Sequence, residues 1–271
     1  MNIFKKLIIS LSIFLPFLSC SDDGTDEIES EIVVEGWIDD GEFPIVIVSR
    51  TLPINSNSRF SFESDSLVEY VGKYAKVTIS DGEQSVVLTG KTNHDYFPPF
   101  IYTTGRMRGK AGQTYHLTVE WDEMRCEADC TIPESPNNVS LTTERVEDNQ
   151  YLIKATLDPA ESDNYHAAFI LVDSMDTRRT LSRMSLVDYG NTLTINHGLA
   201  GDKYFKPGQR VIVNVVSMDK GMYEFWKEYD KLSTFSRNPL FSYNRNLNGN
   251  IRGGMGYWAG YGVSKKGIVI K

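Results

Sequence analysis

Short runs of β-branched and aromatic residues, separated by turn-forming residues about every 8 to 15 positions, dominate this chain. The first runs cover residues 32–38 (IVVEGWI) and 45–48 (IVIV), with Asp39-Asp40-Gly41 between them. The second run is apolar on both faces, which is typical of a central strand between two layers. The spacing therefore predicts an antiparallel, mainly β fold.

Two hairpins are visible in the sequence. Residues 76–80 and 85–89 flank Asp81-Gly82, and glycine tolerates the positive φ that such turns need. Residues 115–121 alternate between apolar and polar side chains, which predicts a half-buried strand. Residues 125–132 are its expected hairpin partner.

Proline-rich residues near the middle of the chain interrupt this pattern. Proline has no backbone N–H and a fixed φ, so Pro133 and Pro136 disfavour strands and helices at these positions. We therefore expect a domain boundary at residues 134–138. The interpretation is an N-terminal β domain over residues 32–135 and a C-terminal β domain over residues 136–271. The predicted fold is mainly β, with two β-sandwich-like domains. One fused sandwich is the alternative.

One segment has helical periodicity instead. In residues 221–233, apolar side chains recur at steps of three and four, which predicts an amphipathic helix near the C-terminus of the second domain. Asp219 is the expected N-cap. We expect the apolar stripe to pack on the β core rather than to stack on a ligand; it consists of Met222, Phe225, Trp226, Tyr229 and Leu232.

The N-terminus has the form of an export signal. Lys5 and Lys6 precede an apolar run over residues 7–18, which is shorter than the about 20 residues that span a bilayer. Ser19 then stands directly before Cys20, as at a bacterial lipoprotein cleavage site. We interpret residues 1–19 as a signal peptide and Cys20 as the lipidated first residue of the mature protein. An uncleaved anchor and a soluble secreted protein are the alternatives.

The residues after Cys20 predict where the protein is delivered. Ser21, Asp22 and Asp23 resemble the acidic tag that sends Bacteroidetes lipoproteins to the outer face of the outer membrane. Residues 20–31 are too acidic and too poor in apolar groups to fold, so we expect a flexible tether that leaves the lipid to anchor the protein. An ordinary acidic linker is the alternative to the tag.

Charge and motifs narrow the function. Removal of Lys5 and Lys6 leaves 26 basic against 36 acidic residues, a formal net charge of −10, which argues against a nucleic-acid partner. We find no nucleophile elbow, zinc helix, P-loop or calcium loop, and we expect no catalytic residues and no cofactor. We expect each scattered histidine to be a surface or satisfied side chain; the four are His94, His116, His166 and His197.

The remaining cysteines, Cys126 and Cys130, lie in a predicted strand. Four residues of extended chain place them on one face about 13 Å apart, too far for a disulfide. They would pair only if the strand bulges or turns. Their spacing, without nearby histidines, does not indicate a metal site, so we expect no metal.

Two groups of aromatic residues are candidate ligand contacts. Tyr96, Phe97 and Phe100 lie in a loop stiffened by Pro98-Pro99, which lowers the entropy cost of binding. The second group lies in a glycine- and aromatic-rich loop expected over residues 248–264, and consists of Tyr257, Trp258 and Tyr261. Core packing is the alternative for both groups.

Four segments, in their order and spacing, resemble the Bacteroidetes lipoproteins grouped as domain of unknown function 4249. They are IVVEGWIDDGEFPIVIVSRT, CTIPESP, YEFWKEYDKLS and the late SRNPLFSYNRNLNGNIRGGMGYWAGYGVS, which is the most specific. The resemblance implies an outer-membrane lipoprotein, commonly encoded beside a TonB-dependent transporter, with a β-rich extracellular body. It brings no assigned catalytic or binding residue. Cys126 and Cys130 depart from the family pattern, and family members often run longer.

We therefore expect a non-catalytic accessory to a TonB-dependent nutrient importer, anchored in the outer membrane by lipid and facing the cell exterior. The alternative is a structural or adhesive surface lipoprotein that binds another protein. A compact apolar pocket would favour the importer role, whereas a flat face with an exposed apolar patch would favour adhesion.

Overall fold

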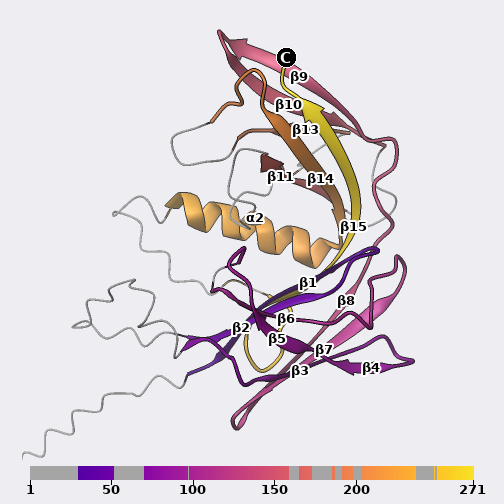
Figure 1. The fold of residues 1–271 in the computed structure, drawn as a ribbon, viewed down its shortest axis with the longest axis vertical. Helices are drawn as coiled ribbons and strands as arrows, with labels where there is room; N and C mark the ends of the chain where they lie inside the picture. The colour runs from indigo at the N-terminus through magenta and orange to yellow at the C-terminus, as the bar shows by residue number, and fades with distance from the viewer. Residues whose placement is uncertain are drawn as a thin grey trace, which may run out of the picture.

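The structure is a computed structural model that describes residues 30–51, 70–96, 98–158, 165–172, 185–186, 191–197, 203–235, 247 and 249–271. Within these ranges the chain is mainly β, with one α-helix near the C-terminus, as the sequence predicts. The strands form sheets of eight, four and three strands. Figure 1 shows two lobes, with the N-terminal strands in one and most C-terminal strands in the other.

The eight-stranded sheet runs through both lobes. Its strands, in spatial order, are β12 (Ser185–Leu186), β11 (Tyr165–Val172), β14 (Arg210–Met218), β15 (Met255–Val269), β1 (Ile32–Asp39), β2 (Ile45–Arg50), β6 (Phe100–Thr103) and β5 (Thr89–Thr92). The four-stranded sheet has the order β4 (Ser85–Val87), β3 (Lys76–Ser80), β7 (Thr114–Trp121) and β8 (Met124–Thr131). The three-stranded sheet has the order β13 (Thr192–Ile195), β10 (Gln150–Thr156) and β9 (Ser140–Glu147).

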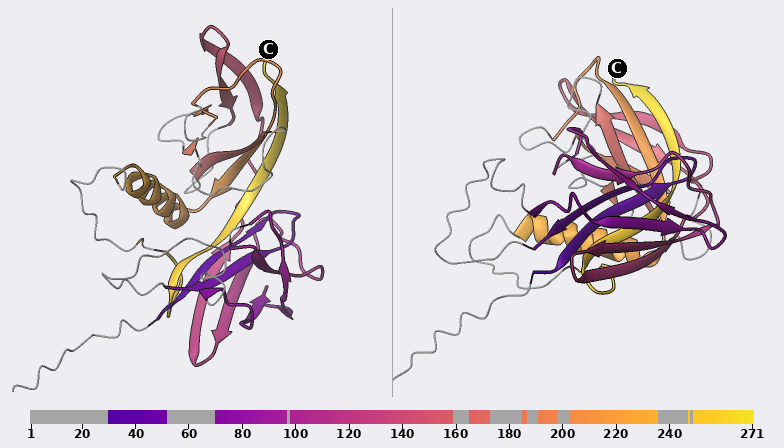
Figure 2. Two further views of the ribbon diagram at one scale, coloured as in Figure 1. Left: turned by 60° about the vertical axis from the view of Figure 1, so that its left-hand side comes forward. Right: turned by 60° about the horizontal axis from the view of Figure 1, so that its bottom comes forward.

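Strand β15 joins the two lobes. Its first half pairs in parallel with β1, with Val33 opposite Met255 and Asp39 opposite Tyr261. Its second half pairs antiparallel with β14, starting with Ser217 opposite Gly262. Figure 2 shows this strand running from one lobe into the other. The chain does pass between lobes after β8, near the expected boundary at 134–138, but β15 returns to both, so the two sandwiches share one sheet.

The N-terminal core lies between the four-stranded sheet and the β15-β1-β2-β6 part of the long sheet. Its pattern follows the predicted alternation, because Leu117, Val119 and Trp121 of β7 are buried. Strand β2 is buried at three consecutive residues, as expected for a central strand. The predicted hairpin is also present: β3 pairs with β4, and Gly82 in the turn has φ +91°.

The C-terminal core lies between the three-stranded sheet and the β11-β14-β15 part of the long sheet. Ile153 and Ala155 of β10, and Leu157 just after it, are buried there against alternate residues of β14 such as Val213. Side chains alternate between the two faces of a strand, so the even-numbered Trp258 and Ile268 of β15 lie on one face. Trp258 packs in the N-terminal core and Ile268 packs against the C-terminal core. The two small sheets therefore cover the same face of the long sheet.

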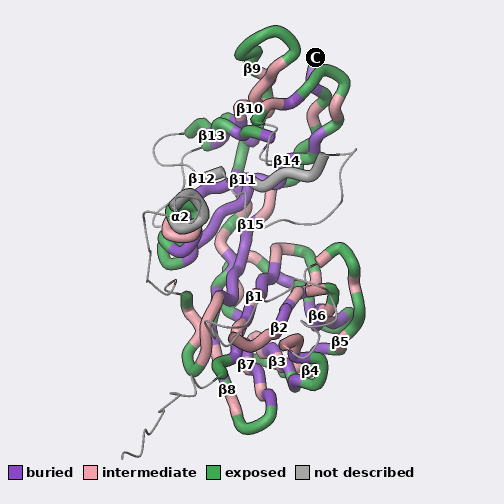
Figure 3. Tube along the Cα trace, turned by 90° about the vertical axis from the view of Figure 1, so that its left-hand side faces the viewer, coloured by how far each residue is buried: buried purple, intermediate pink, exposed green. Residues whose placement is uncertain are grey.

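The opposite face is covered by α2 (Lys220–Phe235), slightly longer than the helix expected over 221–233. The Oδ1 of Asp219 accepts a hydrogen bond from the backbone N–H of Met222 at 2.9 Å, which confirms the predicted N-cap. Met222, Phe225 and Trp226 are buried against the sheet, as expected for the apolar stripe. In Figure 3, α2 lies beside the buried stretch of β15.

The glycine- and aromatic-rich loop expected over residues 248–264 is instead largely strand, since β15 begins at Met255. Its glycines permit close packing. A Cβ on Gly256, which has φ +102°, would lie 1.9 Å from the carbonyl oxygen of Val34. A Cβ on Gly260 would lie 2.7 Å from the carbonyl oxygen of Thr131 in β8. The expected aromatic loop is likewise partly strand, because Phe100 begins β6.

Candidate functional site

Several predicted site residues lie outside the described part of the chain. These are the signal peptide, the lipidated residue, the export tag and one loop aromatic: residues 1–19, Cys20, Ser21, Asp22, Asp23 and Phe97. The remaining candidate aromatic residues are described and fall into two separate cores.

Tyr96, Tyr257 and Tyr261 come together beneath α2, although they are far apart in the sequence. They belong to a group of rings that we call the α2 aromatic cluster, consisting of Trp37, Tyr96, Tyr165, Tyr223, Phe225, Trp226, Tyr229, Tyr257 and Tyr261. The indole N–H of Trp226 donates to the Tyr261 hydroxyl at 2.9 Å, and Tyr165 stacks on Tyr223 with ring centroids 4.5 Å apart. Tyr257 and Tyr261 are buried, so core packing accounts for them.

Trp258 and Phe100 pack in the N-terminal core instead. Trp258 is fully buried, and its indole N–H donates to the carbonyl oxygen of Tyr115 at 3.0 Å. Phe100 meets Tyr102 edge-on at 5.5 Å, above Gly90. These two rings therefore pack in the N-terminal core, which is the alternative that the sequence left open for both groups of aromatic residues.

A polar pocket of about 330 Å³ lies at the edge of the N-terminal lobe, where the chain passes from the four-stranded sheet into the long sheet. We call it the β5–β6 pocket; it is lined by Val87, Thr89, Lys91, Thr103, Thr104, Gly105 and Arg106. The sequence does not predict this pocket, since its residues match no motif and come together only through the pairing of β5 with β6.

Local structure explains how the β5–β6 pocket forms. Leu88, between β4 and β5, is buried in the N-terminal core, so the chain turns there and presents alternate residues on the outside of β5. Thr89 lies directly opposite Thr103 in the pairing of β5 with β6. The Thr104 hydroxyl accepts a hydrogen bond from the backbone N–H of Arg106 at 3.1 Å, which fixes the turn that holds Arg106 at the wall.

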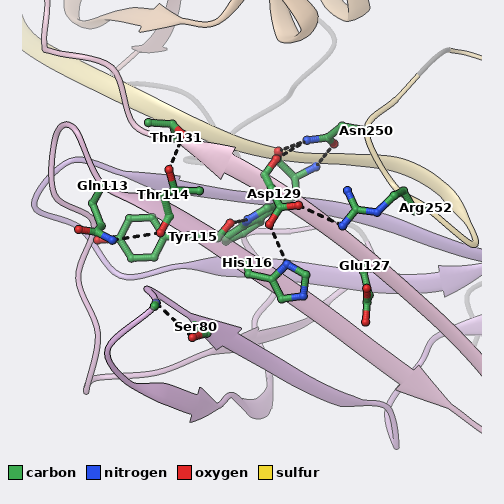
Figure 4. Close-up of polar contacts among 12 residues, drawn as sticks. Ser80, Gln113, Thr114, Tyr115, His116, Glu127, Asp129, Thr131, Asn250 and Arg252 are labelled. Carbon is green, nitrogen blue, oxygen red and sulfur yellow. Dashed lines mark hydrogen bonds and ion pairs between the residues drawn. The ribbon is translucent and has the colours of Figure 1, made fainter.

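A second polar group lies on the outer face of the four-stranded sheet (Figure 4). Asp129 contacts the Nδ1 of His116 at 2.7 Å and the Nη2 of Arg252 at 3.0 Å. The hydrogen bond from His116, followed by that from Arg252, lowers the pKa of Asp129. The Asn250 side chain donates to the carbonyl oxygens of Asp129 and Trp258 and accepts from the Trp258 N–H. This group fastens the segment before β15 to β8, which is a structural role.

The other histidines belong to neither of these two polar groups. His166 is buried, and burial lowers its pKa; its Nδ1 lies 3.3 Å from the Ser217 hydroxyl. His197 is buried against Phe205, and His94 is exposed.

Both strand cysteines are free and buried in the N-terminal core. Burial raises the pKa of the Cys126 thiol to about 11 and raises that of Cys130 as well. The absence of a bond between them agrees with the spacing argument for an extended strand. Among the residues that the structure describes, no three His, Cys, Asp or Glu side chains are placed to hold a metal ion.

Within the described ranges, no helix is both long and apolar enough to cross a membrane. The fold defines a class of mainly β protein in which two sandwiches share one continuous sheet. The chain belongs to the family described as domain of unknown function (DUF4249), whose model matches residues 21–267. This confirms the resemblance to domain of unknown function 4249.

No curated protein matches the chain. Among solved structures, a crystal structure of the FN1–FN3 domains of chicken CNTN1 is similar over 88% of this chain, at 9% sequence identity and a TM-score of 0.28. The alignment covers 66% of that chain. A TM-score this low carries no conclusion about the function of the present protein.

Proposed function

We propose that the protein is a surface-exposed outer-membrane lipoprotein that captures a small hydrophilic ligand and hands it to a TonB-dependent importer, without catalysing a reaction. The lipoprotein pattern around Cys20, the acidic residues that follow it and the neighbourhood implied by the family resemblance support this role. Strand β1 begins at Ile32, directly after the residues 20–31 that the sequence predicts to be a tether.

The observation that carries the proposal is the β5–β6 pocket. Its volume of about 330 Å³ falls in the range of small-molecule sites, and hydroxyl and basic side chains form most of its lining. Val87 is the one large apolar side chain among the lining residues. The pocket is therefore polar, unlike the apolar pocket that the sequence analysis took as the mark of an importer accessory, and it suits a hydrophilic ligand.

The proposal is tested by mild crosslinking on intact outer membranes, followed by purification of the native lipidated protein. A Cys20→Ala form, which has no lipid acceptor, is the matched control. We expect the native protein to recover a TonB-dependent barrel and the control to recover none. Recovery of surface proteins of other classes, or of the protein alone, would overturn the importer role in favour of the structural or adhesive one.

A further inference from the structure

We propose that the β5–β6 pocket binds the oxyanion group of its ligand, so that the captured molecule is a small hydrophilic acid bearing a carboxylate, sulfate or phosphate. This inference rests on the proposed function, because it gives the chemistry of the ligand to be captured. Two cationic side chains, Lys91 and Arg106, line the pocket together with three threonines.

Neither cation has an acidic partner among the residues that the structure describes. Lys91 and Arg106 form no ion pair within the described part of the chain, although the whole protein carries a formal net charge of −8. Among the other arginines of the described ranges, Arg50, Arg125, Arg145 and Arg252 are paired with carboxylates, whereas Arg108 and Arg210 form no ion pair there. Two unpaired cations at one pocket of an acidic protein form a local site that attracts an anion.

Protection of the sheet edge explains the position of Lys91 but not that of Arg106. Lys91 lies on β5, at the edge of the long sheet, and lysines on such edges prevent pairing with other chains. Arg106 lies beyond the end of β6, in a turn fixed by Thr104, so edge protection does not account for it. Its guanidinium presents paired N–H donors that match an oxyanion.

The threonines complete the donor set. Thr89 and Thr103 lie opposite each other on β5 and β6, and both contribute to the pocket lining together with Thr104. A hydroxyl both donates and accepts hydrogen bonds, so these side chains suit the hydroxyl groups of a sugar acid as well as the anion itself. A neutral sugar would leave the two cations without partners.

The test is calorimetric titration of the soluble mature domain, with Cys20 replaced, using glucuronate, glucose and inorganic sulfate as probes. Binding of glucuronate or of sulfate supports the proposal, and the stronger of the two identifies the source of the anion. No binding of either anion at about 10 mM, or equal binding of glucose and glucuronate, would overturn it.

Substitutions locate the site. Arg106→Gln and Lys91→Gln are each expected to weaken binding of the anion about tenfold, because a charge-assisted hydrogen bond is lost. Arg210→Gln and Lys266→Gln, at exposed positions on β14 and β15 in the other lobe, are the matched controls and keep wild-type affinity. Equal affinities for all four variants would overturn the assignment. Anion binding without crosslinking to a barrel would support the anion site and overturn the importer role. Crosslinking to a barrel without anion binding would support the importer role and overturn only the proposed class of ligand.

Discussion

At the scale of single residues, burial decides which titratable groups matter for stability. His166 is 8% exposed and packs beside Ser217 on the C-terminal side of the shared sheet. Burial lowers its pKa below the ordinary value of 6.5. As the pH falls below 6.5, the unfolded chain therefore protonates this histidine before the folded chain does. The contribution of neutral His166 to the free energy of unfolding is complete above pH 6.5 and is lost as the pH falls below that value.

His166→Gln replaces the titratable imidazole with a side chain that does not bind a proton in this pH range. Below about pH 6.5 we expect the free energy of unfolding to fall less steeply with decreasing pH in the variant, by up to about 1.4 kcal/mol per pH unit. Urea unfolding at a series of pH values measures both slopes, and at high pH the two curves should run parallel. Identical slopes below pH 6.5 would show that His166 protonates equally in both states.

Among the helices and strands, the sequence predicted those features that depend on contacts between residues close together in the chain. The alternation in β7, the Asp81-Gly82 turn and the cap of α2 are each satisfied by neighbours in sequence, so they could be predicted. The first part of strand β15, within residues 248–264, was expected to be a loop because glycine is depleted in strands. Its glycines are required by the backbones of β1 and β8, which are distant in sequence.

Gly256→Ala tests this account of β15. The new Cβ would meet the carbonyl oxygen of Val34 at 1.9 Å, in a backbone conformation with φ +102°. We expect a loss of at least about 2 kcal/mol in the free energy of unfolding, measured in urea. Gly267→Ala in the same strand meets nothing within 4 Å and should change stability by less than about 0.5 kcal/mol. Similar losses in both variants would contradict the close packing.

Helix α2 offers a second test at this scale. Asp219→Ala removes the side-chain acceptor for the Met222 N–H, and we expect a loss of about 1 kcal/mol in thermal or urea unfolding. Glu224→Gln, at an exposed position in the same helix, is the control and should be nearly neutral. An unchanged stability of the Asp219 variant would mean that water replaces the cap at no cost.

At the scale of the whole molecule, the sequence predicted two sandwiches but not how they are joined. Strand β8 ends at Thr131 in one lobe and β9 begins at Ser140 in the other (Figure 1), yet β15 is hydrogen-bonded to β1 in the first lobe and to β14 in the second. The β5–β6 pocket was equally hidden, because Lys91 and Arg106 meet only when β5 pairs with β6. Contacts of this kind depend on topology, which residue patterns alone do not specify.

The shared strand predicts cooperative unfolding. Strand β15 contributes to both cores through Trp258 and Ile268. Unfolding of one lobe therefore removes packing from the core of the other. We expect tryptophan fluorescence and far-UV circular dichroism to give coincident urea transitions. Two separated transitions would show that the lobes unfold independently.

The proposed function requires that the folded body stand outside the cell, held to the membrane by the lipid on Cys20. Protease added to intact cells tests it most directly, with detection of the protein by antibody and a periplasmic protein as an internal marker. We expect the native protein to be digested while the marker survives, and we expect the Cys20→Ala form not to be presented on the surface. Protection of the native protein until the outer membrane is opened would contradict it.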